Sequence, residues 1–325
     1  MAKRVRGILA LLVMATIWGG AFVVQKVGSD YLPPFAFNMM RAGIGAVALG
    51  LVMLVMQRSK DAERPAGADI GHVTPETTII RTQNSTYWRD ALVGGLVAGT
   101  VLTCGMAFLQ IGIMYTTASK GGFITALYIV LVPLGGLLMG RRVTRNQWLA
   151  VILGTVGLYL LSFPGNGNFQ IGYGDLITLL GALSYAIHIY VIDYYSQKVD
   201  STLLSWMQIA VSAILSGIIM LLFENPDWSL LPYAIKPLLY VGVMSTAIGF
   251  TCQVYGQKYT DPTTASLIMS LESVFALLFG ILFLAERLSM REFVGAAIMF
   301  TAIILSQVRI KRRAASQGQV SPTKS

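Results

Sequence analysis

Long apolar runs, separated by short polar or turn-forming clusters, follow one another along almost the whole chain. A run of about 17 to 25 apolar residues is what an α-helix needs to cross the hydrocarbon core of a membrane. We therefore predict ten membrane-spanning helices, at residues 7–27, 34–56, 91–113, 120–139, 146–163, 174–195, 202–223, 236–256, 263–284 and 293–308. The runs are too continuous for the alternating pattern of a membrane β-barrel. The sequence thus predicts an all-α integral membrane protein.

The composition supports this class of protein. Of the 325 residues, 55% are hydrophobic and 12% are charged, about half the charged fraction of an average soluble domain. A soluble enzyme, a disordered chain and a nucleic-acid-binding protein are therefore excluded. The two cysteines, Cys104 and Cys252, lie inside apolar runs without the spacing of a zinc site or a disulfide framework, so we interpret them as small hydrophobic residues.

The basic residues predict the orientation. The formal charge of +9 arises from 24 Lys and Arg against 15 Asp and Glu, and membrane proteins collect Lys and Arg in their cytoplasmic segments. With ten spans and a cytoplasmic amino terminus, 18 of the 24 fall on the cytoplasmic side, chiefly before residue 7 and within 57–90, 141–145 and 309–325. We expect both termini in the cytoplasm, 57–90 as a flexible cytoplasmic loop, and 309–325 as a basic cytoplasmic tail.

The two halves of the chain can be overlaid on each other. At an offset of 167 residues, the run around Trp18 falls on the run around Tyr185, and near an offset of 144 the stretch 108–116 falls on 252–260. We predict a first five-helix repeat over 1–163 and a second over 164–308. An odd number of spans in each repeat inverts the second copy. Inverted repeats are typical of secondary transporters, whose substrate site lies between the repeats.

Four stretches also carry a family resemblance: WGG at 18–20, FLQIGIMYTTASKGGFITALYIVLVP at 108–133, the D-L-x-x-L-x-x-A-x-x-Y-A-x-H pattern at 175–188, and SLESVFALLFGILFLAERLS at 270–289. Together they resemble the EamA-type branch of the drug/metabolite transporter superfamily. The resemblance implies an inner-membrane carrier whose central cavity is lined mainly by spans 1, 3, 4, 6, 8 and 9. One departure is that Glu272 is followed by Ser273, where the family usually has proline, so the proline kink is not expected here.

Glu272 is a lone carboxylate near the middle of the ninth predicted span. Such a group is costly in a membrane and normally faces a cavity or a partner. It could bind a substrate ammonium group or a coupling proton, or it could be a structural carboxyl bonded to a neighbouring helix. In the repeat overlay Glu272 corresponds to Tyr128, and Met269 corresponds to Thr125. We therefore expect Thr125, Tyr128, Met269 and Glu272 to line the substrate pathway.

The opposite face of the same two helices carries small residues four positions apart. These residues are Gly122 and Ala126 in the first half and Ser266 and Ser270 in the second. Small residues at this spacing let helices approach closely. We expect these four residues to pack helices.

Span 6 offers Tyr185 and His188 as further pathway residues. The imidazole could shuttle protons or bind a substrate, although a hydrogen bond between two helices is an equal alternative. Trp18 is the counterpart of Tyr185 in the overlay, so an aromatic ring from each half could flank the site, or both could serve packing.

Arg41 lies about two turns into span 2, with Asn38 one turn before it. Arg41 could bind an anionic substrate or pair with Glu272, but a long side chain at this depth can also extend towards the membrane surface. We favour that extension or a structural pair. Gln110, Gln208 and Gln253 add uncharged hydrogen-bonding groups to the expected pathway.

No phosphate-binding loop, nucleotide motif or metal constellation occurs in the sequence, so we expect no cofactor and no ATP-driven transport. The favoured function is a permease for a small organic metabolite, such as an amino acid or a related compound, with protons as a candidate coupling ion. The family resemblance alone favours export as the direction. The partners expected are the lipid bilayer and this metabolite, and no nucleic acid; the oligomeric state is left open. The alternatives are a membrane enzyme acting on lipids and a non-transporting sensor or assembly partner.

Overall fold

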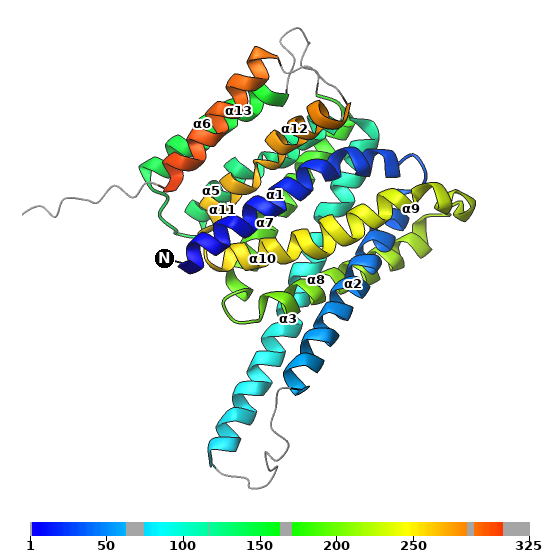
Figure 1. Ribbon diagram of the computed structural model, residues 1–325, viewed down its shortest axis with the longest axis vertical. Helices are drawn as coiled ribbons and strands as arrows, with labels where there is room; N and C mark the ends of the chain where they lie inside the picture. Colours follow the sequence, from blue (N-terminus) through cyan, green and yellow to red (C-terminus); the bar gives the residue numbers. More distant parts are fainter. Residues whose placement is uncertain (1, 63–74, 117, 163–170, 285–288, 308–325) are drawn as a thin grey trace, which may run out of the picture.

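The computed structural model describes residues 2–62, 75–116, 118–162, 171–284 and 289–307. Every element in these ranges is helical, and Figure 1 shows the helices assembled into one bundle. The unbroken long helices are α1 (Ala2–Gly28), α2 (Pro34–Ala62), α3 (Pro75–Tyr115), α6 (Arg145–Ser162), α7 (Tyr173–Tyr195), α8 (Ser201–Phe223) and α13 (Met290–Gln307).

Eight helical segments of the described chain are long and apolar enough to cross a membrane. They are Ala2–Gly28, Pro34–Ser59, Ser85–Tyr115, Gly121–Leu138, Tyr173–Tyr195, Ser201–Phe223, Trp228–Lys258 and Pro262–Phe279. Each matches a predicted span. The other two predicted spans coincide with α6 and α13, which are 18 residues long. Both carry polar residues in their first turn, 145–147 in α6 and 291–292 in α13, and neither is among the eight.

Two predicted spans are interrupted near their middle. The fourth is divided at Leu127 into α4 (Ala118–Ala126) and α5 (Tyr128–Leu138), and the ninth at 270–271 into α11 (Pro262–Met269) and α12 (Glu272–Leu284). At each break the backbone uses bonds of the tighter three-residue kind, from Leu127 N to Ile124 O and from Leu271 N to Ile268 O, both 3.2 Å long; such turns mark helix junctions. The second break forms directly before Glu272 without the family's proline.

Serine side chains give a physical reason for the second break. The hydroxyl of Ser266 donates to Thr263 O at 2.9 Å, and that of Ser270 donates to Leu267 O at 2.8 Å. Hydroxyls that bond to the carbonyls of their own helix compete with the backbone and often bend it. Ser270 therefore weakens the helix at the point where α11 ends.

The eighth predicted span lies within a helical segment made of η1 (Trp228–Leu230), α9 (Leu231–Leu239), the π-helix η2 (Tyr240–Gly249) and α10 (Phe250–Lys258). The π-helix η2 winds more widely than an α-helix, which the apolar pattern does not predict, and we call it the wide turn. The Thr246 hydroxyl donates to Val241 O, five residues earlier, at 2.7 Å. π-Helical turns are rare and occur often at functional sites.

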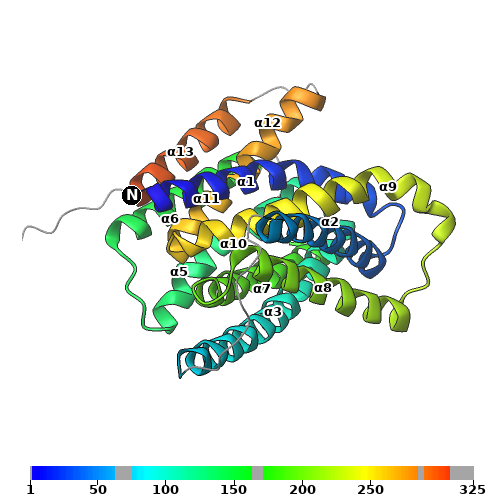
Figure 2. The same cartoon turned by 60° about the horizontal axis from the view of Figure 1, so that its bottom comes forward.

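Helices from the two halves of the chain pack against each other throughout the bundle. α3 lies along α7 and α8, α2 along α8, and α1 along α10 and α12. α6 and α13 form a pair at one side of the bundle in Figures 1 and 2. These two helices meet at glycines, since a Cβ built on Gly157 would lie 2.7 Å from the carbonyl oxygen of Gly295.

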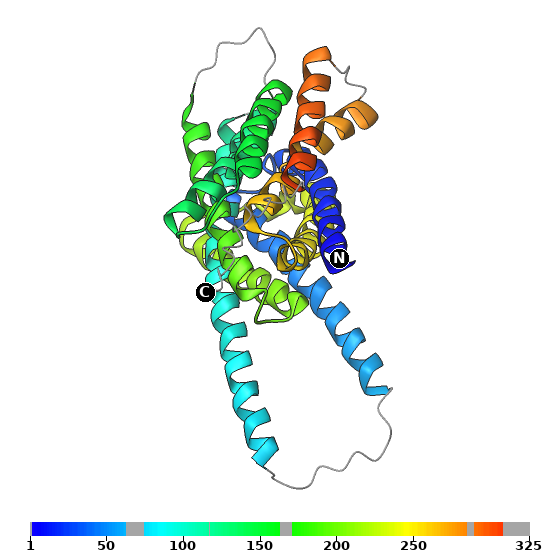
Figure 3. The same ribbon diagram turned by 90° about the vertical axis from the view of Figure 1, so that its left-hand side faces the viewer.

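Much of the predicted loop 57–90 is helical, so the prediction of a flexible loop is wrong for these parts. α2 continues to Ala62 and α3 already begins at Pro75, and Figures 1 and 3 show both helices running well beyond the rest of the bundle. Gln, Arg, Lys and Glu favour helices, and proline is well suited to the first helical position, so a helix can continue where the apolar pattern stops. Residues 63–74 and the tail 309–325 lie outside the described residues.

Candidate functional site

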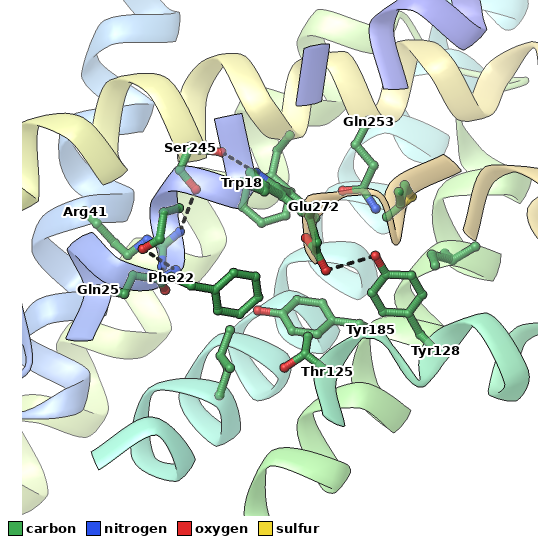
Figure 4. Close-up of a pocket in the computed structure, with 15 residues that line it drawn as sticks. Trp18, Phe22, Gln25, Arg41, Thr125, Tyr128, Tyr185, Ser245, Gln253 and Glu272 are labelled. Atoms are coloured by element: carbon green, nitrogen blue, oxygen red, sulfur yellow. Dashed lines mark hydrogen bonds between the residues drawn. The ribbon is translucent and has the colours of Figure 1, made fainter. Parts of the chain in front are cut away.

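A cavity lies between the two halves, among helices α1, α2, α3, α7 and α10, the wide turn η2 and the two broken helices. Eight of the expected pathway residues line it: Trp18, Arg41, Thr125, Tyr128, Tyr185, Gln253, Met269 and Glu272. Seven further residues complete the lining: Ala21, Phe22, Gln25, Leu109, Ile189, Ser245 and Phe250. Figure 4 shows the fifteen side chains together.

The helix breaks place four of these residues. Thr125 lies in the last turn of α4, and Tyr128 is the first residue of α5. Met269 is the last residue of α11, and Glu272 is the first residue of α12. A regular helix could direct only one stripe of side chains towards the cavity. The interruptions change the chain direction at the cavity wall, so that residues before and after each break both line it.

Glu272 and Tyr128 form a hydrogen bond across the two halves. The Tyr128 hydroxyl donates to Glu272 Oε1 at 3.1 Å, and the two residues are only 1% and 2% exposed. No ion pair involves Glu272 within the described part of the chain. The carboxyl group is therefore buried at the cavity with a neutral donor as its partner.

Arg41 is also buried, at 4% exposure, and its guanidinium is held by neutral groups. Nε donates to Thr246 Oγ1 at 3.2 Å, Nη1 to Gln25 Oε1, and Nη2 to Ser245 Oγ at 3.3 Å. The expectation that Arg41 extends towards the membrane surface is wrong, because these three acceptors from α1 and η2 hold the side chain inside the bundle. Nor does an ion pair join it to Glu272 in the described structure.

Trp18 is fixed between η2 and α10. Its indole Nε1 donates to Ser245 O at 3.0 Å, and its ring meets the edge of Phe250 with 5.0 Å between the ring centroids. Ser245 therefore accepts two hydrogen bonds, one from Trp18 through its carbonyl oxygen and one from Arg41 through its hydroxyl oxygen. Figure 4 shows this chain of contacts at one end of the cavity and the Glu272–Tyr128 bond at the other.

Four expected pathway residues do not line the cavity. His188 Nε2 lies 2.8 Å from Gln208 Oε1, and both residues are fully buried. This hydrogen bond joins α7 to α8 and is of the kind given above as the alternative role of His188. Gln110 donates to the backbone oxygen of Gln25 at 3.5 Å, so it lies behind a cavity residue. The Asn38 side chain is fully buried, and no described residue bonds to its amide.

The four small residues expected to pack helices are all buried. Gly122, however, makes no close helix approach, since a Cβ built there would lie 3.9 Å from Phe22, an ordinary contact. The reason is that a large aromatic side chain, and not a helix backbone, faces it. The close approach occurs at Gly19 of α1, where a Cβ would lie 2.7 Å from the carbonyl oxygen of Glu272.

Sequence reasoning missed Gln25, Phe22 and Ser245. The first two could have been found, because positions 18, 21, 22 and 25 follow the i, i+3, i+4, i+7 spacing of one helix face. Ser245 had no such signal, since its position depends on the wide turn of η2. Within the described residues, no three His, Cys, Asp or Glu side chains gather as a metal-binding group.

Comparisons with known proteins agree with this architecture. The EamA-like transporter family matches residues 5–163 and 172–307. An uncharacterized transporter of Archaeoglobus fulgidus is 31% identical over 95% of this chain and 88% of its own length, and the uncharacterized transporter YoaV of Bacillus subtilis is 23% identical over 95% and 99%. A crystal structure shares the fold with a TM-score of 0.70 and 15% identity over 93% of this chain and 96% of that one. The chain belongs to the EamA-like transporter family.

Proposed function

We propose that the protein is a secondary carrier that exports a small organic metabolite, such as an amino acid or a related compound, across the inner membrane by alternating access. The observation that carries this proposal is the cavity between the two halves, which holds the buried residues Arg41 and Glu272, neither of them in an ion pair with another described residue. Buried charges in membrane proteins mark substrate or ion pathways.

The packing of the helices supports alternating access through two inverted repeats, 1–163 and 164–308. Under the sequence overlay α1 corresponds to α7, and the broken helix α4–α5 corresponds to α11–α12. The contact of α1 with α12 then has a counterpart in the contact of α7 with α5. Broken helices at corresponding positions of the two repeats characterise the substrate sites of secondary transporters.

The proposed topology has ten crossings with both termini in the cytoplasm. In that arrangement α6 and α13 are the fifth span of each repeat, and the basic residues 141–145 anchor the cytoplasmic side. The glycine contact between α6 and α13 is of the kind that brings membrane helices together.

Counterflow in proteoliposomes tests the proposal. The purified full chain is reconstituted, loaded with one unlabelled solute, and assayed for uptake of the same labelled solute over a panel of amino acids and other small metabolites. We expect saturable exchange of at least one solute, absent from protein-free liposomes. Monodisperse protein that exchanges nothing over the panel would overturn the carrier proposal, and uptake exceeding efflux in oriented vesicles would overturn the export direction.

A further inference from the structure

We propose that the cavity has two charged subsites and binds a zwitterion, with its carboxylate at Arg41 and its ammonium group at Glu272. The inference rests on the proposed carrier function and assigns the polar ends of its site. Its starting point is that the fifteen lining residues include one cation and one anion, Arg41 and Glu272. No ion pair joins them to each other or to another described residue.

Burial without a counter-charge is costly for both groups. Arg41 is 4% exposed and Glu272 is 2% exposed, and a charge removed from water is stabilised only by close partners of good geometry. Their partners in the described structure are neutral side chains. A ligand with an anionic and a cationic end would supply the missing counter-charge to both.

The geometry at Arg41 suits a carboxylate. A guanidinium has five N–H donors in a fixed fork, and Thr246, Gln25 and Ser245 accept from three different nitrogens. These bonds fix the plane of the group while two N–H donors remain. Arginine commonly binds carboxylates through two parallel hydrogen bonds, and Gln25 and Ser245 line the same cavity and could adjust around the ligand.

The geometry at Glu272 suits an ammonium group. Tyr128 donates to Oε1, and no described residue donates to Oε2. Aromatic rings also attract cations to their faces, and Trp18, Phe22 and Tyr185 line the cavity. In the view of Figure 4 the ring of Phe22 lies between the side chains of Arg41 and Glu272, and the ring of Tyr185 lies below Glu272.

The test measures ligand binding separately from transport. The purified full chain is heated in detergent with each of the twenty protein amino acids and with unbranched β-, γ-, δ- and ε-amino acids, whose two charged groups lie progressively further apart. Every amino acid that stabilises the protein is compared with its amide, its deaminated acid and its decarboxylated amine. A ligand that binds only the folded state raises the unfolding temperature, and the rise at a given ligand concentration grows with the logarithm of its affinity, so titrations compare the dissociation constants. We expect at least one amino acid to bind, and each single-charge analogue to bind at least about tenfold more weakly, as the loss of a charged partner at a buried site requires.

Two variants test which residue binds which charged group of the ligand. In Arg41→Gln the amine should bind as well as the amino acid, while the deaminated acid stays weak; in Glu272→Gln the deaminated acid should bind as well as the amino acid, while the amine stays weak. Gln208→Leu breaks a buried hydrogen bond outside the cavity. It should leave unchanged both the ratio of the affinities for the amino acid and the amine and the ratio for the amino acid and the deaminated acid. If Arg41→Gln does not fold, Arg41→Lys replaces it and should weaken binding of the amino acid while leaving affinity for the amine unchanged.

The outcomes separate this proposal from the carrier function. Single-charge analogues that bind the wild-type protein as tightly as the amino acid would overturn the two subsites, as would equal losses for all ligands in both variants. If no amino acid binds but counterflow detects another solute, the zwitterion site is overturned and the carrier stands. If neither assay detects a ligand, both proposals fail.

Discussion

Arg141 Nη1 lies 2.7 Å from Asp193 Oδ2, an ion pair that joins the segment after α5 to the last turns of α7. The Arg141 guanidinium also lies 5.2 Å from the centroid of the Tyr190 ring, and the Tyr190 hydroxyl donates to Val132 O. In the proposed topology these contacts connect the two repeats on the cytoplasmic side. They would favour the conformation in which that side is closed.

We predict that Asp193→Ala opens the cytoplasmic side without unfolding the protein. The Arg141 and Asp193 side chains are 44% and 17% exposed, and exposed ion pairs contribute up to about 1 kcal/mol, so the unfolding temperature should change little. The same energy shifts a two-state equilibrium by about fivefold. A cysteine at cavity position 189 should react about that much faster with a membrane-impermeant thiol reagent added from the cytoplasmic side.

The labelling experiment uses Ile189→Cys in a chain whose Cys104 and Cys252 are replaced by alanine. The charge-exchanged variant Arg141→Asp/Asp193→Arg is the matched control and should return the labelling rate to that of the parent. Equal rates in the parent and in Asp193→Ala would show that the ion pair does not hold this side closed.

Glu272→Gln should reduce the transport rate by at least about tenfold, the effect of removing a charge–charge partner at a buried site. The amide can still accept the hydrogen bond from Tyr128, so the unfolding temperature should stay near that of the wild type, whereas the charge that would bind an ammonium group or a proton is lost. Initial rates of counterflow and of proton-gradient-driven transport between pH 5 and pH 9 give the measurement. An unchanged rate with an unchanged pH profile would remove Glu272 from the mechanism, and Tyr128→Phe serves as a control that keeps the charge.

Gly19→Ala should destabilise the protein by about 1–3 kcal/mol, the usual cost of forcing an extra methyl group into a packed core. Its Cβ would lie 2.7 Å from Glu272 O and 2.8 Å from the backbone nitrogen of Ala276, and backbone atoms cannot move aside as a flexible side chain can. Gly43→Ala is the matched control, because a Cβ there meets nothing within 4 Å and alanine favours the helix. Thermal unfolding in detergent should therefore separate the two variants clearly, and equal stability would contradict the close contact between α1 and α12.

Gly122→Leu should lower the unfolding temperature more than Thr125→Leu. Position 122 is buried, and a Cβ built there would already lie 3.9 Å from the Phe22 ring, so the further atoms of a leucine would compete with that ring for space. Position 125 lines the cavity, and its hydroxyl has no bonding partner among the described residues, so a leucine there loses no hydrogen bond and can extend into open space. The reverse order of stability would mean that the two helix faces are assigned the wrong way round.

Hydropathy predicted where the helices lie because every backbone group in hydrocarbon must bond within its own helix. It could not predict where α2 ends or α3 begins, because outside the membrane a helix no longer depends on apolar residues. The breaks at Leu127 and before Glu272 were equally hidden, since both lie inside an apolar run, and the second accompanies hydroxyl-to-backbone hydrogen bonds that hydropathy does not record.

For the site, intramembrane polar residues and the repeat overlay identified Glu272, Tyr128 and Thr125 as candidates that do lie at the cavity. The same reasoning could not separate them from His188 and Gln208, because a polar side chain inside a span looks the same in sequence whether it faces a cavity or a neighbouring helix. Only the partner across the helix interface decides this, and that partner is distant in sequence.

The π-helix η2 brings one serine into contact with two other residues of the cavity lining. Ser245 reaches both Trp18 and Arg41 because the ten residues Tyr240–Gly249 wind more loosely than an α-helix. Rewinding them to α geometry would turn α10 relative to α9 like a screw and carry Ser245 away from both partners. We expect movement of the cavity wall during transport to include such a change of winding, so that the bonds of Ser245 to Trp18 and to Arg41 break together.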